Sequence, residues 1–294
     1  MSRKAAVLEA PPEGPETAVE EDEFDVLVER TRGLKSLRPR ELLAYRELLY
    51  FLTWRDIKVR YKQTVIGAAW AILQPVLAMI LFTFVFGHVA KISSSGIPYP
   101  IFAYSALVPW YFFATSVQLS SNSLVGNTQL VTKVYFPRIF VVVSPVLAGA
   151  IDFALAFLII IALMAYYDIA PTIGIVALPA LFALATATAL GVGAWLAALN
   201  VKYRDVRFAV PFLLQLWFFA TPIVYAIDTL AQPWRTLFGM NPMAGVVLGF
   251  RWALAGGAAP EGLTAVLSAV GGVAILCAGL IYFARTEKSF ADVI

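Results

Sequence analysis

Charged side chains are scarce in this sequence. They make up 14% of its 294 residues, against about a quarter in soluble domains, while 60% of the residues are hydrophobic. This balance excludes an ordinary soluble domain and predicts an integral membrane protein. The net charge of +3 is small, and the basic residues stand beside apolar runs, so we expect no nucleic acid partner.

Cysteine and histidine are almost absent. Cys277 is the single cysteine, so no disulfide can form within the chain. His88 is the single histidine, and it stands at the outer end of a predicted membrane segment. A catalytic site inside a membrane needs a cluster of ionisable groups, which the sequence does not offer. We therefore predict no catalytic residue and no metal site.

The sequence also lacks a phosphate-binding loop, because no glycine is followed by lysine anywhere in it. If nucleotide hydrolysis drives this protein, another chain must bind the ATP and its magnesium ion. We expect no cofactor on this chain itself.

Residues 1–40 are rich in proline, glutamate and alanine, acidic from Glu13 to Glu29 and basic from Arg30 onwards. Such a segment is predicted to be a cytosolic, disordered tail. It contains no apolar core of the length that a secretory signal needs, so the first membrane helix is expected to act as the insertion signal.

Residues 41–64 are predicted to form an amphipathic interface helix. Tyr45, two leucines and Leu52 recur at the spacing of one helical face, and basic residues fill most of the rest. The apolar face is expected in lipid and the basic face toward anionic headgroups. Asp56 falls on the apolar stripe, so either the helix bends there or Asp56 faces a partner.

The charges that crowd the start of Trp54–Pro75 stop abruptly and do not return until Lys91. Because basic residues stay on the cytoplasmic side, this stretch sets the orientation of the first span. Trp70 and Gln74, in the apolar half, are expected to form the first wall of a channel.

The apolar runs predict an all-α fold, with a transmembrane domain at 65–284 and a cytosolic tail at 285–294. The six predicted spans are about 65–89, 101–119, 139–166, 173–199, 208–227 and 263–284. Ten basic residues between Arg30 and Lys62, five in the inner loops and two at the end lie inside, against three outside. Both termini are therefore expected in the cytoplasm.

Residues 232–258 are apolar but too short to span and are interrupted by proline and glycine. This pattern favours a re-entrant helical hairpin between the last two spans. The alternative is an amphipathic outer loop on the membrane surface. The residues singled out there are Trp234, Arg235, Asn241, Pro242 and Arg251.

Asp152 is the one acid deep inside a predicted span. A carboxylate in a membrane is either functional, for example as a proton relay, or structural, bonded to polar side chains of a neighbouring helix. The sequence leaves both open.

Aromatic residues concentrate in the second and fifth spans. Their flat faces and polar tips suit sugar rings, so some are expected to line a polymer path. The alternative is an aromatic belt with lipid-facing packing. The candidates are Tyr104, Trp110, Tyr111, Phe112, Phe113, Trp217 and Tyr225.

Five blocks together carry a resemblance. RDIKVRYKQTVIGAAWAILQP, YFPR, NVKYRDVR, TPIVY, and NPM with a following GFRWAL are similar to the membrane subunit of ABC-2 type exporters of cell-surface polysaccharides. These export O-antigen, capsule and teichoic acid chains. The resemblance covers about residues 41–290 and leaves the acidic tail aside.

The resemblance implies a half-channel that pairs with a second copy of itself and carries two copies of a separate nucleotide-binding ATPase. It implies export of a lipid-linked polysaccharide across the bacterial cytoplasmic (inner) membrane. By position, the ATPase contacts would be Arg55, Asp56, Lys58, Arg60, Lys62, Lys133, Tyr135, Arg138, Lys202, Arg204, Asp205 and Arg207.

Two other classes remain in competition on the residues alone. One is an ion- or proton-coupled carrier of a small solute that uses Asp152. The other is a membrane-embedded transferase acting on lipid-linked sugars, which the missing catalytic cluster disfavours.

Overall fold

The computed structural model describes residues 43–62, 67, 69–170, 172–229, 231, 233–257 and 259–290. Every regular element in these ranges is a helix, which confirms the all-α prediction. The predicted tail at 1–40 lies outside the described residues. So do positions 41–42 and 63–64 of the predicted interface helix, 65 and 66 of the first span, and 291–294.

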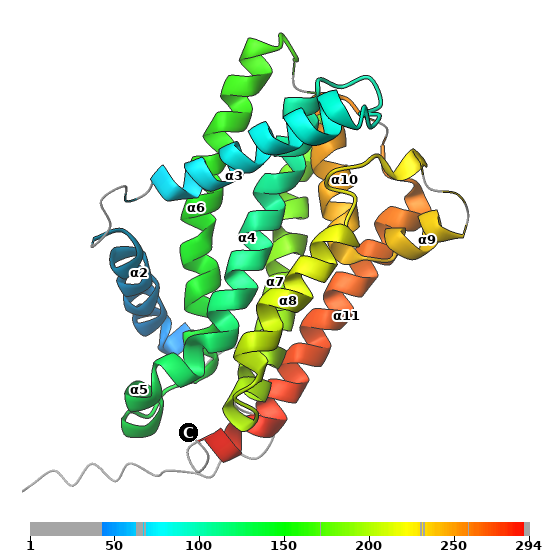
Figure 1. Ribbon diagram of the computed structural model, residues 1–294. Coiled ribbons are helices and arrows are strands. Elements are labelled where there is room, and N and C mark those ends of the chain that lie inside the picture. The colour runs from blue at the N-terminus through cyan, green and yellow to red at the C-terminus, as the bar shows by residue number, and fades with distance from the viewer. Residues whose placement is uncertain are drawn as a thin grey trace, which may run out of the picture. The chain divides into compact units, whose positions relative to one another are not determined.

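The long helices form the central bundle of the described residues (Figure 1). They are α4 (Tyr99–Gly126), α6 (Ile139–Tyr166), α7 (Leu178–Lys202, preceded by η3, Ile173–Ala177) and α11 (Gly262–Thr286). Two helices form the centre: α4 packs against α6 and α7, and α7 packs against α11. The π-helix η2 (Thr83–Val89) continues α3 (Ala69–Phe82), which lies obliquely across α4 and α6 and contacts both.

Four helices are long and apolar enough to cross a membrane. They are Ala69–Val89, Ile139–Tyr166, Ile173–Lys202 and Gly262–Thr286. They coincide with the first, third, fourth and sixth predicted spans. A count of six spans therefore goes beyond what the described helices show by length and composition.

The second predicted span, 101–119, is part of a longer helix, α4, whose 28 residues carry no charge but are not apolar enough to count as a span. The physical reason is its burial in protein. Most serines on its buried faces donate to a carbonyl, as Ser120 does to the Val142 oxygen at 2.8 Å, and Ser116 is the exception.

The fifth predicted span, 208–227, is wrong in length. Helix α8 (Val206–Phe219) has 14 residues, about 21 Å of helix against a hydrocarbon core of about 30 Å. Pro222 disfavours a helical backbone conformation at the residue before it, Thr221, so the helix does not continue through this point.

The irregular segment folds as a short helix, α9 (Trp234–Gly239), and a longer one, α10 (Pro242–Ala255), after the single turn η4 (Ile227–Thr229). Helix α10 packs against α4, α7 and α11, and most of its residues are buried. Burial in protein is what a re-entrant segment needs. Its depth in a membrane stays a prediction.

The interface helix, α2 (Arg46–Lys62), packs against α6. Leu48, Leu49 and Leu52 of its apolar stripe pack against protein, while Tyr45 is 37% exposed, so contact of this helix with lipid stays a prediction. Leu52 is 5% exposed in a cluster with Ile139 and Phe140 of α6. The face that remains exposed carries Phe51 and other side chains, among them Trp54, Lys58 and Val59. The remaining short helices are α5 (Thr128–Lys133) and η5 (Glu287–Ser289).

Helices α7 and α11 approach to backbone contact at a pair of glycines. A Cβ added to Gly191 would lie 2.6 Å from the Ile275 oxygen, and one added to Gly279 would collide with the Gly191 backbone. Small residues allow such close approach of helices in membranes.

Candidate functional site

A partly buried ion pair joins α2 to α6. The Arg60 guanidinium donates from Nη1 to Oδ2 of Asp152, and the Tyr61 hydroxyl donates to Oδ1 of the same carboxylate. The Arg60 and Asp152 side chains are 22% and 21% exposed, so water screens the pair only partly. Asp152 thus has a structural partner, and it comes from α2.

Asp56 also has its partner within the chain. Its Oδ2 accepts a 2.6 Å hydrogen bond from the Ser144 hydroxyl of α6, while Oδ1 accepts from Arg55 at 2.8 Å. The acid falls on the apolar stripe of α2 because that stripe packs against α6. Two polar links, at Asp56 and Arg60, therefore join these helices.

A cavity of about 250 Å³ opens beside the Arg60–Asp152 pair. It lies between the end of α2, the first turns of α3, and the middles of α4 and α6. Its polar and aromatic lining groups are Arg60, Tyr61, Trp70, Gln74, Tyr111, Phe112, Thr115, Asp152 and Phe153. The structure therefore brings Trp70 and Gln74, expected on a channel wall, to one cavity with Tyr111.

Most of the candidate aromatics do not face open space. Tyr104 and Phe113 are 0% exposed, and Trp110 and Phe112 are 4% exposed. Phe113 packs edge-on against Trp217 with ring centroids 5.0 Å apart. Four of the seven candidates are thus core residues in this chain. Tyr111, Trp217 and Tyr225 are partly exposed.

Arg251 is almost fully buried, at 4% exposed, and bonds to backbone carbonyls. Its Nε donates to the Phe102 oxygen at 3.1 Å, Nη1 to Pro222 at 2.5 Å, and Nη2 to Ile223. The guanidinium also stacks on the Phe102 ring, 3.6 Å from its centroid. It anchors α10 to the non-helical turn after α8.

Asn241 holds the same turn from the other end of α10. Its Oδ1 accepts from Met243 N at 3.0 Å, which caps α10, and from Trp217 Nε1 at 2.8 Å. Its Nδ2 donates to Thr221 Oγ1 at 2.9 Å. Pro242 at the first helical position fits this start, since its missing N–H is not needed there.

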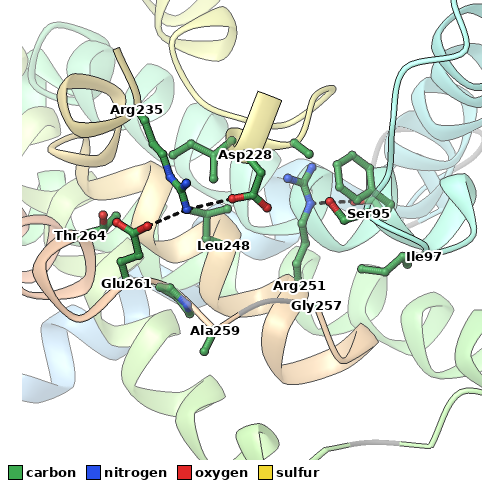
Figure 2. Close-up of a pocket in the computed structure, with 14 residues that line it drawn as sticks. Ser95, Ile97, Asp228, Arg235, Leu248, Arg251, Gly257, Ala259, Glu261 and Thr264 are labelled. Carbon is green, nitrogen blue, oxygen red and sulfur yellow. Dashed lines mark hydrogen bonds and ion pairs between the residues drawn. The ribbon is translucent and has the colours of Figure 1, made fainter. Parts of the chain in front are cut away.

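Arg235 bridges two acids beside a second, smaller cavity of about 60 Å³ (Figure 2). Its Nη2 lies 2.9 Å from Asp228 Oδ1 and 2.6 Å from Glu261 Oε1. The bridge joins α9 to η4 and to the start of α11. Trp234, the other residue predicted here, is exposed.

The predicted inner loops present mostly exposed side chains. Tyr135 is 76% exposed, and the remaining exposed residues of the set are Lys133, Lys202, Arg204, Asp205 and Arg207. Lys202 and Arg207 lie over the rings of the aromatic residues that follow them. Arg138 differs, because its Nη1 donates to the Glu287 oxygen at 2.6 Å.

Sequence reasoning missed three residues of this arrangement. Tyr61 and Thr115 line the cavity, and Ser144 binds Asp56. Tyr61 had a weak signal, since it follows Arg60 directly. Ser144 and Thr115 had none, because hydroxyls on apolar helices usually bond to their own backbone.

These features define a multi-pass helical membrane protein with a polar cavity between helices. Among the described residues, no group of three or more His, Cys, Asp or Glu could hold a metal ion. The chain belongs to the ABC-2 type transporter family, whose sequence model matches residues 47–255. Proteins of this family supply the membrane subunit of an ABC transporter, and the ATPase is a separate subunit.

Sequence alignments with curated relatives extend over most of the chain. The chain is 31% identical over 256 residues to the O-antigen export system permease protein RfbA of Myxococcus xanthus, covering 86% of this chain and 97% of that protein. It is 29% identical over 249 residues to an RfbA of Klebsiella pneumoniae, and that alignment covers 84% of this chain and 95% of the relative. The polysialic acid transport protein KpsM of Escherichia coli is 20% identical to this chain over 239 residues, which are 80% of this chain and 92% of KpsM.

Proposed function

We propose that this chain is the permease subunit of an ATP-driven exporter that moves a lipid-linked cell-surface polysaccharide, of O-antigen or capsule type, across the cytoplasmic membrane. The observation that carries the proposal is the 31% identity over 97% of an O-antigen export permease. Teichoic acid chains belong to the same chemical class of cargo.

The working unit in this proposal is a homodimer with two ATPase subunits on its cytoplasmic side. ATP and magnesium bind to the ATPase, in keeping with the missing phosphate loop of this chain. A rotation of the ATPase pair moves the membrane helices through the loops that it contacts.

In the proposed topology, α4 and α8 add two membrane segments to the four apolar spans, and both termini are cytoplasmic. The asymmetry of basic residues supports this orientation. Helices α9 and α10 re-enter the membrane from the outer side. Their burial against α4, α7 and α11 supports this, because backbone at membrane depth needs protein around it.

The proposed coupling surface contains fewer residues than the sequence alone suggested. The groups that reach the ATPase are Lys58 and Lys62 on α2, Lys133 and Tyr135, and Lys202, Arg204, Asp205 and Arg207, all of them exposed. Arg55 is partly exposed, and its guanidinium pairs with Asp56. Asp56, Arg60 and Arg138 have partners within the chain. These three transmit movement of α2 and of the inner loop, and do not dock the partner.

An ion- or proton-coupled carrier is less favoured. Its relay would be Asp152, and that carboxylate is occupied by a guanidinium and a phenol. A relay needs a carboxylate that is free to take up and release a proton, and these two donors occupy both oxygens of Asp152.

Deletion of the gene in its host tests the proposal. Lipid-linked polysaccharide should accumulate inside the cytoplasmic membrane while surface polysaccharide disappears, and a plasmid copy should restore export. Normal surface polysaccharide in the deletion strain, with no accumulated intermediate, would reject it.

A further inference from the structure

We propose that the cavity beside Arg60 and Asp152 binds one neutral sugar ring of the lipid-linked polysaccharide. This inference rests on the proposed function and adds a binding site within each protomer. It stands on the size, the charge and the lining of the cavity.

The size admits one ring and not a chain. A volume of about 250 Å³ lies below the range of roughly 300–1,000 Å³ that is usual for drug-sized ligands. The described lining comes from four helices and the residue Gly67, and the cavity is partly open. A polymer could place a single residue here while the rest of the chain lies elsewhere.

The charge favours a neutral ligand. Arg60 and Asp152 are the charged side chains on the described lining, and they neutralise each other. A phosphate group would meet a guanidinium that already has a carboxylate partner, and it would be repelled by that carboxylate. The first turn of α3 borders the cavity, and helix N-termini attract anions, so pyrophosphate is the competing ligand to be tested.

The lining suits hydroxyl groups and apolar C–H faces together. Asp152 accepts hydrogen bonds, Gln74 both donates and accepts, and the Tyr111 hydroxyl does the same. Trp70 is 49% exposed at the edge, where its indole can cover one face of a ring. Phe112 and Phe153 add apolar surface to the lining.

The position gives the site a role. Arg60 and Tyr61 belong to α2, and the neighbouring face of α2 carries the exposed basic residues proposed to meet the ATPase. A movement of α2 that separates Arg60 from Asp152 would free a carboxylate for the sugar hydroxyls. Occupation of the cavity and movement of α2 are therefore linked.

Cysteine labelling tests the site directly, because Cys277→Ser alone makes the chain cysteine-free. Ala71, on the cavity wall, is replaced by cysteine as reporter, and the exposed Ser93, in the proposed outer loop and away from α2, is replaced by cysteine as the matched control. The permease–ATPase complex is placed in nanodiscs without glycolipid. The rate of modification by a small hydrophilic maleimide is measured with glucose, galactose, mannose, inorganic pyrophosphate, or lipid-linked polysaccharide extracted from the deletion strain.

We expect a sugar or the lipid-linked polysaccharide to slow labelling at position 71 by about fivefold at four-fifths occupancy, and labelling at position 93 to be unchanged. Pyrophosphate should have no effect. Adding Gln74→Leu to the reporter should abolish the protection. Protection by pyrophosphate alone, or no protection by any probe, would overturn the inference. Failure of the same complex to export polysaccharide would instead reject the proposed function.

Discussion

Arg60 of α2 and Asp152 of α6 form an ion pair across 92 positions of sequence. The pair joins the helix at the proposed cytoplasmic interface to the middle of a membrane span. Tyr61 completes the same contact through its hydroxyl. Movement of α2 is therefore transmitted to α6 through a side-chain contact as well as through apolar packing.

Removal of either partner should destabilise the protein. We expect Asp152→Asn and Arg60→Gln each to lower the free energy of unfolding by about 2 kcal/mol, because each leaves a partly buried charge without its partner. Thermal unfolding of the purified protein in detergent measures this.

The double variant Arg60→Gln/Asp152→Asn supplies the control for that prediction. It should lose less stability than the sum of the two single variants, because no uncompensated charge remains. Single variants as stable as the original protein would show that the pair contributes nothing. Full stability with complete loss of transport in Asp152→Asn would revive the carrier hypothesis.

Arg251 should be essential for folding although it is far from α2. Arg251→Met removes the donor to the carbonyl oxygens of Pro222 and Ile223, and each unpaired oxygen costs about 1–3 kcal/mol. Arg251→Lys should rescue little, because an ammonium cannot reproduce the planar donor geometry. The measurement is the yield of monodisperse protein on gel filtration.

Arg235 provides the comparison for Arg251. Its side chain is 32% exposed and its acidic partners are about half exposed, so Arg235→Gln should change stability by less than about 1 kcal/mol. Equal yields of the Arg251 and Arg235 variants would contradict the assigned roles.

The α7–α11 contact should tolerate no side chain. Gly279→Ala places a methyl group against the Gly191 backbone, and we expect a loss of about 1–3 kcal/mol or more from the forced separation of the helices. Gly262→Ala, on the same helix with nothing within 4 Å, is the matched control. Indistinguishable thermal unfolding of the two variants would argue against this packing.

Two neighbouring aromatics should behave differently. Trp110→Ala should lower the yield of folded protein, since removal of a buried tryptophan costs about 3–5 kcal/mol. Tyr111→Ala, on the cavity wall, should reduce export at near-normal yield. Quantified export and membrane abundance of both variants provide the test, and normal export by Tyr111→Ala would remove that residue from the site.

Charge reversal should expose the coupling surface. Lys58→Glu combined with Arg204→Glu should abolish stimulation of the ATPase by the permease without loss of folded protein, because both side chains are exposed and have no structural acid partner among the described ion pairs. Lys91→Glu, on the proposed outer side, is the control. If the double variant stimulates the ATPase as much as the original protein does, these contacts are rejected.

Much of this fold follows from the sequence, for reasons that particular segments illustrate. The third, fourth and sixth spans are long and strongly apolar on average, and hydropathy alone finds them. Helix α4 was predicted too short, because most of its buried serines donate to carbonyl oxygens inside the bundle and so do not end the helix. Helix α8 was predicted too long, because apolar residues continue past Pro222 into a turn.

The site was less predictable than the fold. Asp152 stands out as an acid in a membrane span, but its partner could have come from any helix. Asp56 looked misplaced because the neighbour that covers the stripe of α2 is decided by tertiary packing. The burial of Arg251 could not be predicted, because its partners are backbone carbonyls, which carry no signature in the sequence.

The most direct test of the whole account is ATP-dependent translocation by the purified permease–ATPase complex in proteoliposomes. Lipid-linked polysaccharide extracted from the deletion strain is placed on the ATPase side, and its transfer to the other side is measured with a glycan-specific lectin. The account predicts transfer that requires both ATP and this chain. Transfer without ATP, or ATP hydrolysis with no movement of polysaccharide in a complex that is folded and assembled, would contradict it.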